Sequence, residues 1–419
     1  MDFIVDVINQ LKPAIYLPAI QHTYARGVVS NRPHRRLPAG ATLNDLNFLA
    51  PGSKFFNLDA ALYSAGQIKD HRNPPACMVS TRKRGGQQST LIMGDSGGYQ
   101  IATGQIAITP NKREDIFHWL VQTCDLAMTL DVPTSALQMK KTVKYRTFSD
   151  CLVETLGHLE AFKALGAEQG YFLNVLQGLT LEESDEWYDA VKRYNFYGWA
   201  ISGTQKETLK HLLWRILHLI KDGKFDRDET WLHFLGIGDL KTAVLLTTLR
   251  DALRQRFPHC AINVSYDTST PFLLAGRHLT VLDAPSLRPR GLHIRTHKID
   301  KETWVGSRDP FPYTLSTISE GLQKGDIIRR NWKGEIGPDS LGTMMLINHN
   351  VEVQVISIDA IHSLLSAGLP KPHLQQILPY HLLEAREAIE AVLGEPTLKG
   401  AWERLLKKET LRVLDNSHR

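Results

Sequence analysis

The sequence has few cysteines and lacks long apolar runs, and each shortage excludes a class of protein. Its four cysteines, Cys77, Cys124, Cys151 and Cys260, lie far apart, and none forms the closely spaced pair of a zinc site or redox motif. No apolar segment approaches the roughly 20 residues of a membrane-spanning helix. The amino terminus has acidic residues where a secretory signal has basic ones. We therefore expect a soluble cytoplasmic protein with reduced thiols and no membrane partner.

The composition is that of a folded protein with a mild excess of positive charge. Hydrophobic residues make up 42% and charged residues 22% of the 419 residues, and the formal net charge is +5. This charge permits a polyanionic partner without requiring one, and a solvated basic loop is the commoner explanation of any arginine run. The candidate phosphate-binding residues are Arg26, Arg32, Arg35, Arg36, Arg82, Lys83, Arg84, Arg277, Arg288 and Arg290.

Short apolar runs that end in polar residues or glycine alternate with helical patterns. The expected strands are residues 14–20, 54–58, 91–93, 126–130, 171–176, 198–201, 233–235 and 261–266. The clearest helical patterns are 151–165, 182–194, 207–219 and 241–257. This rhythm predicts an α/β protein with a (β/α)8 barrel, in which the strand ends meet at one mouth. A doubly wound sheet is the competing arrangement, although the first strand lacks the glycine fingerprint of a dinucleotide site.

The pattern divides the chain into three parts. Residues 1–276 are expected to form the barrel core with the active site. Residues 277–340 are rich in Arg, Pro and His, break this rhythm, and are expected to form an inserted subdomain. Residues 341–419 return to helical patterns and are expected to pack on the barrel as a helical carboxyl-terminal part.

Three aspartates, Asp95, Asp131 and Asp267, follow different strand candidates. Any one of them could simply cap the next helix. Three carboxylates at one mouth instead favour acid-base or nucleophilic chemistry at a glycosidic or carbonyl centre. A barrel glycosidase or lyase that acts on small molecules is one possibility at this stage.

The segment Asp-Ser-Gly-Gly-Tyr-Gln at residues 95–100 resembles the Asp-Ser-Gly-Gly-aromatic-Gln motif of the tRNA-guanine transglycosylases. Later segments are similar to motifs of that family in the same order. These segments are residues 173–178, 198–203, 235–238, 264–268 and 341–350. The resemblance extends from about residue 14 to residue 393, and the first motif is its most specific part.

The resemblance implies a role for each strand-end residue. Asp267 would be the nucleophile that attacks C1′ of a guanosine, and Asp95 would be the general acid-base. Asp131 would accept hydrogen bonds from N1–H and the exocyclic amine of a guanine-like base. The remaining base-binding residues would be Ser96, Tyr99, Gln100, Gln177, Gly178, Gly203, Leu235 and Gly236. Among these, Gln177 would donate to O6, and Tyr99 and Leu235 would sandwich the ring.

The chain departs from the family at its zinc site. Family members bind structural zinc with three cysteines and the histidine of a His-Asn pair, whereas this chain keeps His349 and Asn350 but has no cysteine after Cys260. We expect no structural zinc and no cofactor, and we expect His349 to be a core histidine.

In the family the zinc subdomain also contacts the nucleic acid, so the resemblance implies that residues 277–340 face nucleic acid. The altered zinc region therefore bears on the substrate that the resemblance implies. The chain looks more like the DNA-acting branch of the superfamily, which exchanges guanine for a 7-deazaguanine such as preQ0. DNA is favoured over tRNA as the partner, together with the free base. Other expectations are an ATP-dependent helper protein and a homodimer. A non-catalytic nucleic-acid-binding subunit is the alternative that retains the resemblance without the chemistry.

Overall fold

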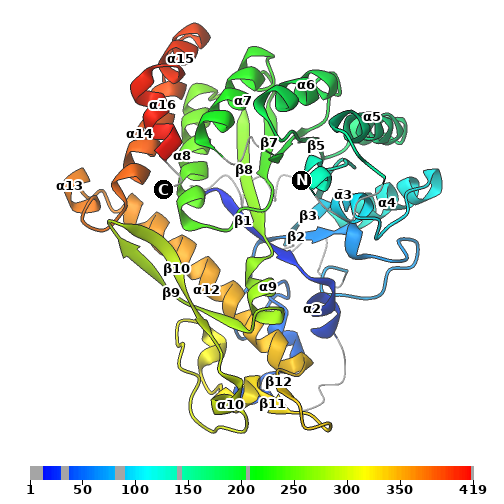
Figure 1. Cartoon of the computed structure of the whole chain (residues 1–419), viewed down its shortest axis with the longest axis vertical. Helices are drawn as coiled ribbons and strands as arrows, with labels where there is room; N and C mark the ends of the chain where they lie inside the picture. The colour runs from blue at the N-terminus through cyan, green and yellow to red at the C-terminus, as the bar shows by residue number, and fades with distance from the viewer. Residues whose placement is uncertain (1–12, 30–36, 81–89, 139–143, 204–207, 417–419) are drawn as a thin grey trace.

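Eight parallel strands close into a barrel in the computed structural model (Figure 1). The structure describes residues 13–29, 37–80, 90–138, 144–203 and 208–416. The barrel strands are β1 (Ile15–Ile20), β2 (Ala60–Ser64), β3 (Leu91–Asp95), β4 (Leu126–Met128), β5 (Phe172–Leu176), β6 (Gly198–Ile201), β7 (Glu229–Phe234) and β8 (Ala261–Thr268). Strand β8 pairs with β1 and closes the ring, with Leu17 opposite Asp267. The predicted (β/α)8 fold is confirmed.

Helices connect the strands and surround them. They are α2 (His22–Gly27), α3 (Gly98–Ala102), α4 (Pro110–Thr123), α5 (Phe148–Ala164), α6 (Leu181–Val191), α7 (Leu209–Lys221), α8 (Leu240–Arg256) and α9 (Thr270–Gly276). Short 3-10 turns occupy Pro38–Gly40, Leu43–Leu46, Ala65–Gln67, Thr134–Gln138, Ala167–Gln169 and Thr317–Ser319. Four of the longer helices match the predicted patterns to within a few residues. In the part of the chain that the structure describes, no helix has both the length and the apolarity to cross a bilayer.

The second strand lies further along the chain than its pattern predicts. We expect a strand at residues 54–58, but β2 is the following segment, Ala-Ala-Leu-Tyr-Ser. Phe55 and Phe56 belong instead to an irregular segment that packs against the outer core, where Phe56 stacks on Phe48 with ring centroids 5.6 Å apart. Small alanines carry a weak strand signal, so the aromatic pair misplaces the prediction.

The strands alternate between the barrel interior and the surrounding helices. The interior core contains Leu17, Leu62, Met93 and Val175 from four different strands, all buried. Because side chains alternate along a strand, residues two positions apart share the interior face. The last interior-facing residue of a strand therefore points into the mouth of the barrel.

Residues 277–340 form two hairpins and short helices rather than a repeat of the barrel unit. The elements are β9 (Thr280–Arg288), β10 (Gly291–Lys298), α10 (Lys301–Trp304), α11 (Lys324–Ile327), β11 (Arg329–Arg330) and β12 (Ile336–Gly337). β9 and β10 pair antiparallel, and β9 contacts both α9 and the long helix α12 (Ser340–Ser366). Buried Trp304, Phe311 and Ile327 belong to the same hydrophobic cluster as the barrel's outer core.

The carboxyl-terminal part is helical, as expected, but more divided than its pattern predicts. After α12 come α13 (Lys371–Leu374), α14 (Tyr380–Leu393), α15 (Leu398–Leu405) and α16 (Lys408–Asn416). Pro379 directly precedes α14, and because a proline ring disfavours helical geometry in the residue before it, α13 and α14 remain separate. Helix α14 contacts α8, which attaches this part to the barrel.

Candidate functional site

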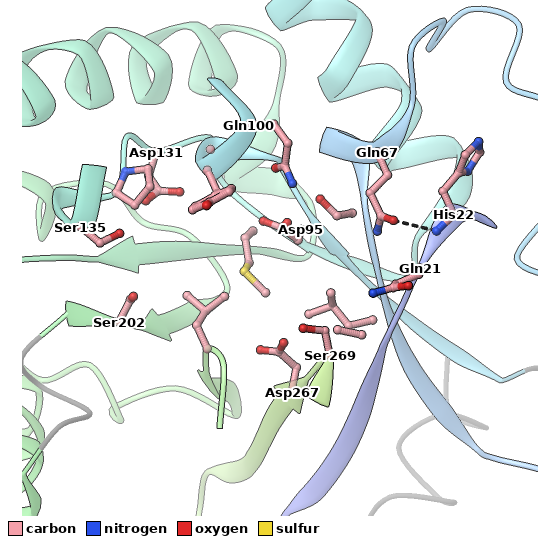
Figure 2. Close-up of a pocket in the computed structure, with 18 of the residues that line it drawn as sticks. Gln21, His22, Gln67, Asp95, Gln100, Asp131, Ser135, Ser202, Asp267 and Ser269 are labelled. Atoms are coloured by element: carbon pink, nitrogen blue, oxygen red, sulfur yellow. Dashed lines mark hydrogen bonds between the residues drawn. The ribbon is translucent and has the colours of Figure 1, made fainter. Parts of the chain in front are cut away.

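A cavity of about 570 Å³ opens at the carboxyl ends of the barrel strands (Figure 2). This volume falls within the range typical of small-molecule sites. The lining residues are Ala19, Gln21, His22, Thr23, Leu62, Ser64, Gln67, Asp95, Gly98, Tyr99, Gln100, Met128, Asp131, Pro133, Ser135, Gln177, Ser202, Leu235, Asp267, Ser269 and Arg277. All three aspartates singled out in the sequence line this cavity.

Strand alternation explains how two of the carboxylates, those of Asp95 and Asp267, reach the cavity, whereas Asp131 lies in the segment after β4. Asp95 is in phase with Leu91 and Met93, which point into the barrel. Asp267 is likewise two residues beyond Ser265 on β8. Figure 2 shows both carboxylates and that of Asp131 pointing into the same space.

The helix-cap alternative for these aspartates can be compared with the caps that form. Thr109, Thr147, Thr180, Thr208 and Asp239 accept the capping hydrogen bonds of α4, α5, α6, α7 and α8. The helices of the barrel are therefore capped largely by threonines, and the three strand-end aspartates face the cavity instead.

Asp95 lies where burial favours a bound proton. Desolvation raises its pKa above the ordinary value and the nearby Asp267 carboxylate raises it further, although hydrogen bonds from Ser64 and Gly97 oppose the shift. The Gly97 N–H donates to Asp95 Oδ1 over 3.3 Å. Gly97 has φ +86° and lies against the backbone of Gly66, so this turn leaves no space for a side chain.

Asp131 and Gln177 form a hydrogen-bonded pair on one wall of the cavity. The Gln177 amide donates to Asp131 Oδ2 over 2.7 Å, and Asp131 is only 7% exposed. Desolvation, with a contribution from Asp95, raises the pKa of Asp131 to about 7, even though the Gln177 hydrogen bond lowers it. This carboxylate can accept N–H donors from a ligand at neutral pH, and its ionisation is sensitive to pH in that range.

Asp267 is held through one of its two oxygens. The Gly236 N–H donates to Asp267 Oδ1 over 2.9 Å, and His233 Nε2 lies 3.2 Å from the same oxygen. Gly236 has φ +69°, a conformation that favours glycine. Among the described residues, no hydrogen bond reaches Oδ2, so this oxygen is the one available to an electrophile.

A buried chain of hydrogen bonds behind Asp267 orients His233. The Trp231 indole lies 2.7 Å from Ser265 Oγ, which in turn lies 2.8 Å from His233 Nδ1. Because an indole N–H can only donate, Ser265 accepts from Trp231, and its hydroxyl hydrogen can be donated to His233 Nδ1. In the tautomer in which Ser265 donates to Nδ1, the Nε2–H of His233 donates a hydrogen bond to Asp267 Oδ1.

The predicted base-binding residues divide into two groups. Tyr99, Gln100, Gln177 and Leu235 line the cavity, and Tyr99 is 49% exposed. The others, Ser96, Gly178, Gly203 and Gly236, lie behind this lining.

The residues behind the lining have identifiable packing roles. The Ser96 hydroxyl donates to the Thr129 carbonyl over 3.0 Å. Gly203 packs directly on the backbone of Gly178, where a Cβ atom could not fit. Gly236 contributes its N–H to Asp267 rather than to the cavity.

The candidate phosphate-binding residues also differ in position. Arg277 follows α9 and lines the cavity, and Arg26 is exposed on α2. Arg288 and Arg290 are exposed at the turn between β9 and β10. The remaining candidates lie outside the described residues, and they are Arg32, Arg35, Arg36, Arg82, Lys83 and Arg84.

His349 is a core histidine, as predicted. Its Nε2 lies 2.7 Å from the Leu282 carbonyl and its Nδ1 lies 2.5 Å from Ser316 Oγ. Burial lowers the pKa of His349 to about 4, so it is neutral at physiological pH. Asn350 likewise bonds to backbone groups around β9. Within the described ranges, no cluster of three His, Cys, Asp or Glu residues is arranged to hold a metal ion.

Several lining residues come from strands whose ends carry no obvious motif. His22 and Gln67 follow β1 and β2, and the Gln67 side chain accepts from the His22 N–H over 2.7 Å. His233 could have been found from period-two alternation with Trp231 and Leu235, because all three belong to the interior face.

No protein-family model matches the sequence, and no curated protein is significantly similar to it. The fold and the cavity define the protein as a (β/α)8 barrel with three carboxylates in a pocket at the carboxyl ends of its strands. Any statement about its reaction has to come from the chemistry of that pocket.

Proposed function

We propose that this protein is a transglycosylase that exchanges guanine in a polynucleotide, with DNA favoured, for a 7-deazaguanine such as preQ0. The observation that carries the proposal is the convergence of Asp95, Asp131 and Asp267 on one cavity in three different environments. The Asp131 carboxylate is hydrogen-bonded to the Gln177 amide. Burial favours the protonated form of Asp95, and Asp267 is held through one of its two oxygens. These are the properties needed for base recognition, proton transfer and nucleophilic attack, respectively.

In the first half of the reaction, Asp267 Oδ2 attacks C1′ of the target nucleoside. The bond from C1′ to N9 of guanine breaks, and its electron pair leaves with the base. Asp95 gives its proton to the departing base, and an ester bond joins Asp267 to the sugar. The two donors on Asp267 Oδ1 keep the carboxylate in place during the attack.

In the second half, the incoming 7-deazaguanine occupies the same pocket. Its N9–H proton passes to the Asp95 carboxylate, and N9 attacks C1′ as the ester bond to Asp267 breaks. Two inversions at C1′ leave the original configuration, and both carboxylates return to their starting states.

Asp131 and Gln177 supply the selection for a guanine-like base. An ionised Asp131 accepts two N–H donors from the base edge, and the Gln177 hydrogen bond fixes the direction of that carboxylate. Tyr99 and Leu235 line the cavity as flat and apolar surfaces for the ring. Because C1′ is covered in a stacked helix, the target nucleotide must turn out of its stack to enter.

The choice of DNA depends on the rebuilt zinc region. His349 occupies the position of the family's metal-binding histidine. Both of its ring nitrogens are engaged in hydrogen bonds, one with the Ser316 hydroxyl and one with the Leu282 carbonyl. A reorganised subdomain beside a complete set of pocket carboxylates favours a polynucleotide other than the usual tRNA.

The test is incorporation of labelled preQ0 or guanine into DNA and into tRNA by the purified protein. We expect label in DNA, and we expect Asp267→Asn to abolish incorporation. Asp239→Asn is the matched control, because Asp239 caps α8 and does not line the cavity. Binding of nucleic acid without incorporation into either polymer would favour the non-catalytic alternative, and label in tRNA alone would reverse the choice of substrate.

A further inference from the structure

The hairpin of β11 and β12 presents an indole to solvent. Trp332 is 89% exposed, the largest exposed fraction among the large hydrophobic residues that the structure describes. The other exposed aromatic residues, Tyr99 and Tyr380, are 49% and 52% exposed. An indole at this level of exposure has no packing role within the described chain.

The turn that carries Trp332 is held by several hydrogen bonds. The Asn331 side-chain oxygen accepts from the N–H groups of Lys333 and Glu335, over 2.9 and 3.0 Å. The Arg330 guanidinium donates to the Gly334 carbonyl over 2.9 Å. The indole is therefore displayed on an ordered turn, which lowers the entropy lost when it binds a partner.

The surroundings of Trp332 are positively charged. Arg329, Arg330 and Lys333 are all exposed, and Lys333 Nζ lies 5.0 Å from the centroid of the indole ring. Two acidic side chains lie nearby: Glu335 accepts from Asn331 over 2.7 Å, and Asp326 Oδ1 lies 3.8 Å from the Arg329 guanidinium, which leaves a net positive charge on the hairpin. An exposed aromatic face beside cations is the combination that binds bases and phosphates of nucleic acids.

The hairpin lies at the same end of the barrel as the cavity. Strand β12 leads directly into α12, whose amino-terminal part packs on α9 and α2, with Met344 against Gly27 and Thr343 near Gly276. Helices α2 and α9 follow β1 and β8 at their carboxyl ends, and Arg277 at the end of α9 lines the cavity. Figure 1 shows β11 and β12 at the end of the molecule that carries α9 and α2.

We infer that the hairpin of residues 329–337 is a second nucleic-acid contact, in which Trp332 stacks on a base next to the nucleotide in the cavity. This inference rests on the proposed function and identifies how the polynucleotide is held outside the pocket. Turning a base out of its stack exposes the faces of its neighbours, and an exposed indole at the cavity's end of the barrel can cover one of them. The three cations contact the phosphates on either side.

The experiment measures binding of fluorescein-labelled duplex and single-stranded DNA by anisotropy, without free base, so that no chemistry is needed. Trp332→Ala should weaken binding roughly 5- to 100-fold, as expected for loss of one base-aromatic stack. Trp332→Phe, which keeps an aromatic face, should restore a large part of the affinity. Tyr380→Ala is the matched control, an exposed aromatic residue on α14, and should bind like the parent.

The dependence on salt gives a separate readout of the cations. Replacing both Arg329 and Lys333 with Gln should lower the slope of log K against log salt by about 2. Trp332→Ala should leave that slope unchanged, because the indole releases no counterions.

The outcomes separate the inference from the proposed function. If the parent incorporates labelled base and Trp332→Ala binds DNA equally well, the inference is overturned and the proposed function stands. If Trp332→Ala weakens binding but the parent incorporates no base, the inference stands and the proposed function fails. If the parent protein binds neither DNA nor tRNA, the inference and the proposed function are both contradicted. Trp332 would then be a candidate contact for a protein partner.

Discussion

Replacing Asp131 with Asn should make the protein more stable at neutral pH while weakening its binding of a guanine-like base. Asp131 is buried, and its pKa is raised to about 7 mainly by desolvation. A carboxyl group whose pKa is raised on folding stabilises the fold below its unfolded pKa, and that contribution is lost as pH rises through the folded pKa. Asn has nearly the same shape, can accept the Gln177 hydrogen bond, and does not ionise.

The magnitude follows from the two pKa values. With an unfolded pKa of about 3.8 and a folded pKa of about 7, the ionised group costs up to about 4 kcal/mol above neutrality. Between about pH 5 and pH 8, the free energy of unfolding of the parent should fall by roughly 2–3 kcal/mol relative to the Asp131→Asn variant.

Urea unfolding of both proteins at several pH values measures this difference. Asp309→Asn is a control of opposite sign, because a hydrogen bond from Lys324 lowers the pKa of Asp309. Calorimetric titration with preQ0 measures base binding by the same two proteins. An Asp131→Asn variant that is equally stable or less stable at pH 8, or that binds preQ0 as tightly as the parent, would refute the reasoning.

Three further predictions concern residues around the same cavity. His233→Phe should slow formation of the covalent adduct by about 10- to 100-fold while leaving preQ0 affinity unchanged, and His233→Gln, which keeps a donor near Asp267, should recover part of the rate in single-turnover assays. Gly98→Ala should lower both preQ0 affinity and the free energy of unfolding, by about 1–3 kcal/mol for the latter, because a Cβ atom would collide with the Asp131 backbone. Arg277→Gln should reduce the salt slope of DNA binding by about 1, measured by anisotropy, whereas an unchanged slope would remove Arg277 from the phosphate contacts.

The barrel fold and the placement of the three carboxylates at its mouth could be predicted from the sequence. Each aspartate follows a short apolar run, and the carboxyl ends of parallel strands meet at one mouth whatever the detailed packing. Asp95 alone could equally have been a helix cap, and only its combination with the other strand ends indicated a site, although Gly97 and Gly98 two and three residues later mark the end of the strand. Strand β2 was misplaced because its alanines have a weak strand signal beside Phe55 and Phe56.

The arrangement behind Asp267 could not be predicted from the sequence in the same way. His233 meets Ser265 because β7 and β8 pair in a particular register. That register depends on how the whole barrel closes, and a shift by one residue would turn His233 out of the interior. The role of the Gly236 N–H is equally a product of this geometry, since it depends on a positive φ beside a neighbouring strand.

The most direct test of the proposed reaction is the mass of a trapped covalent complex. The protein is incubated with guanine-containing DNA in the absence of free base, denatured, digested and mapped by mass spectrometry. We predict a sugar-linked nucleotide attached to the peptide that contains Asp267, and its loss in Asp267→Asn. An adduct on another residue, or exchange of labelled base by the Asp267→Asn variant at the parent's rate, would contradict the assignment of Asp267 as the nucleophile.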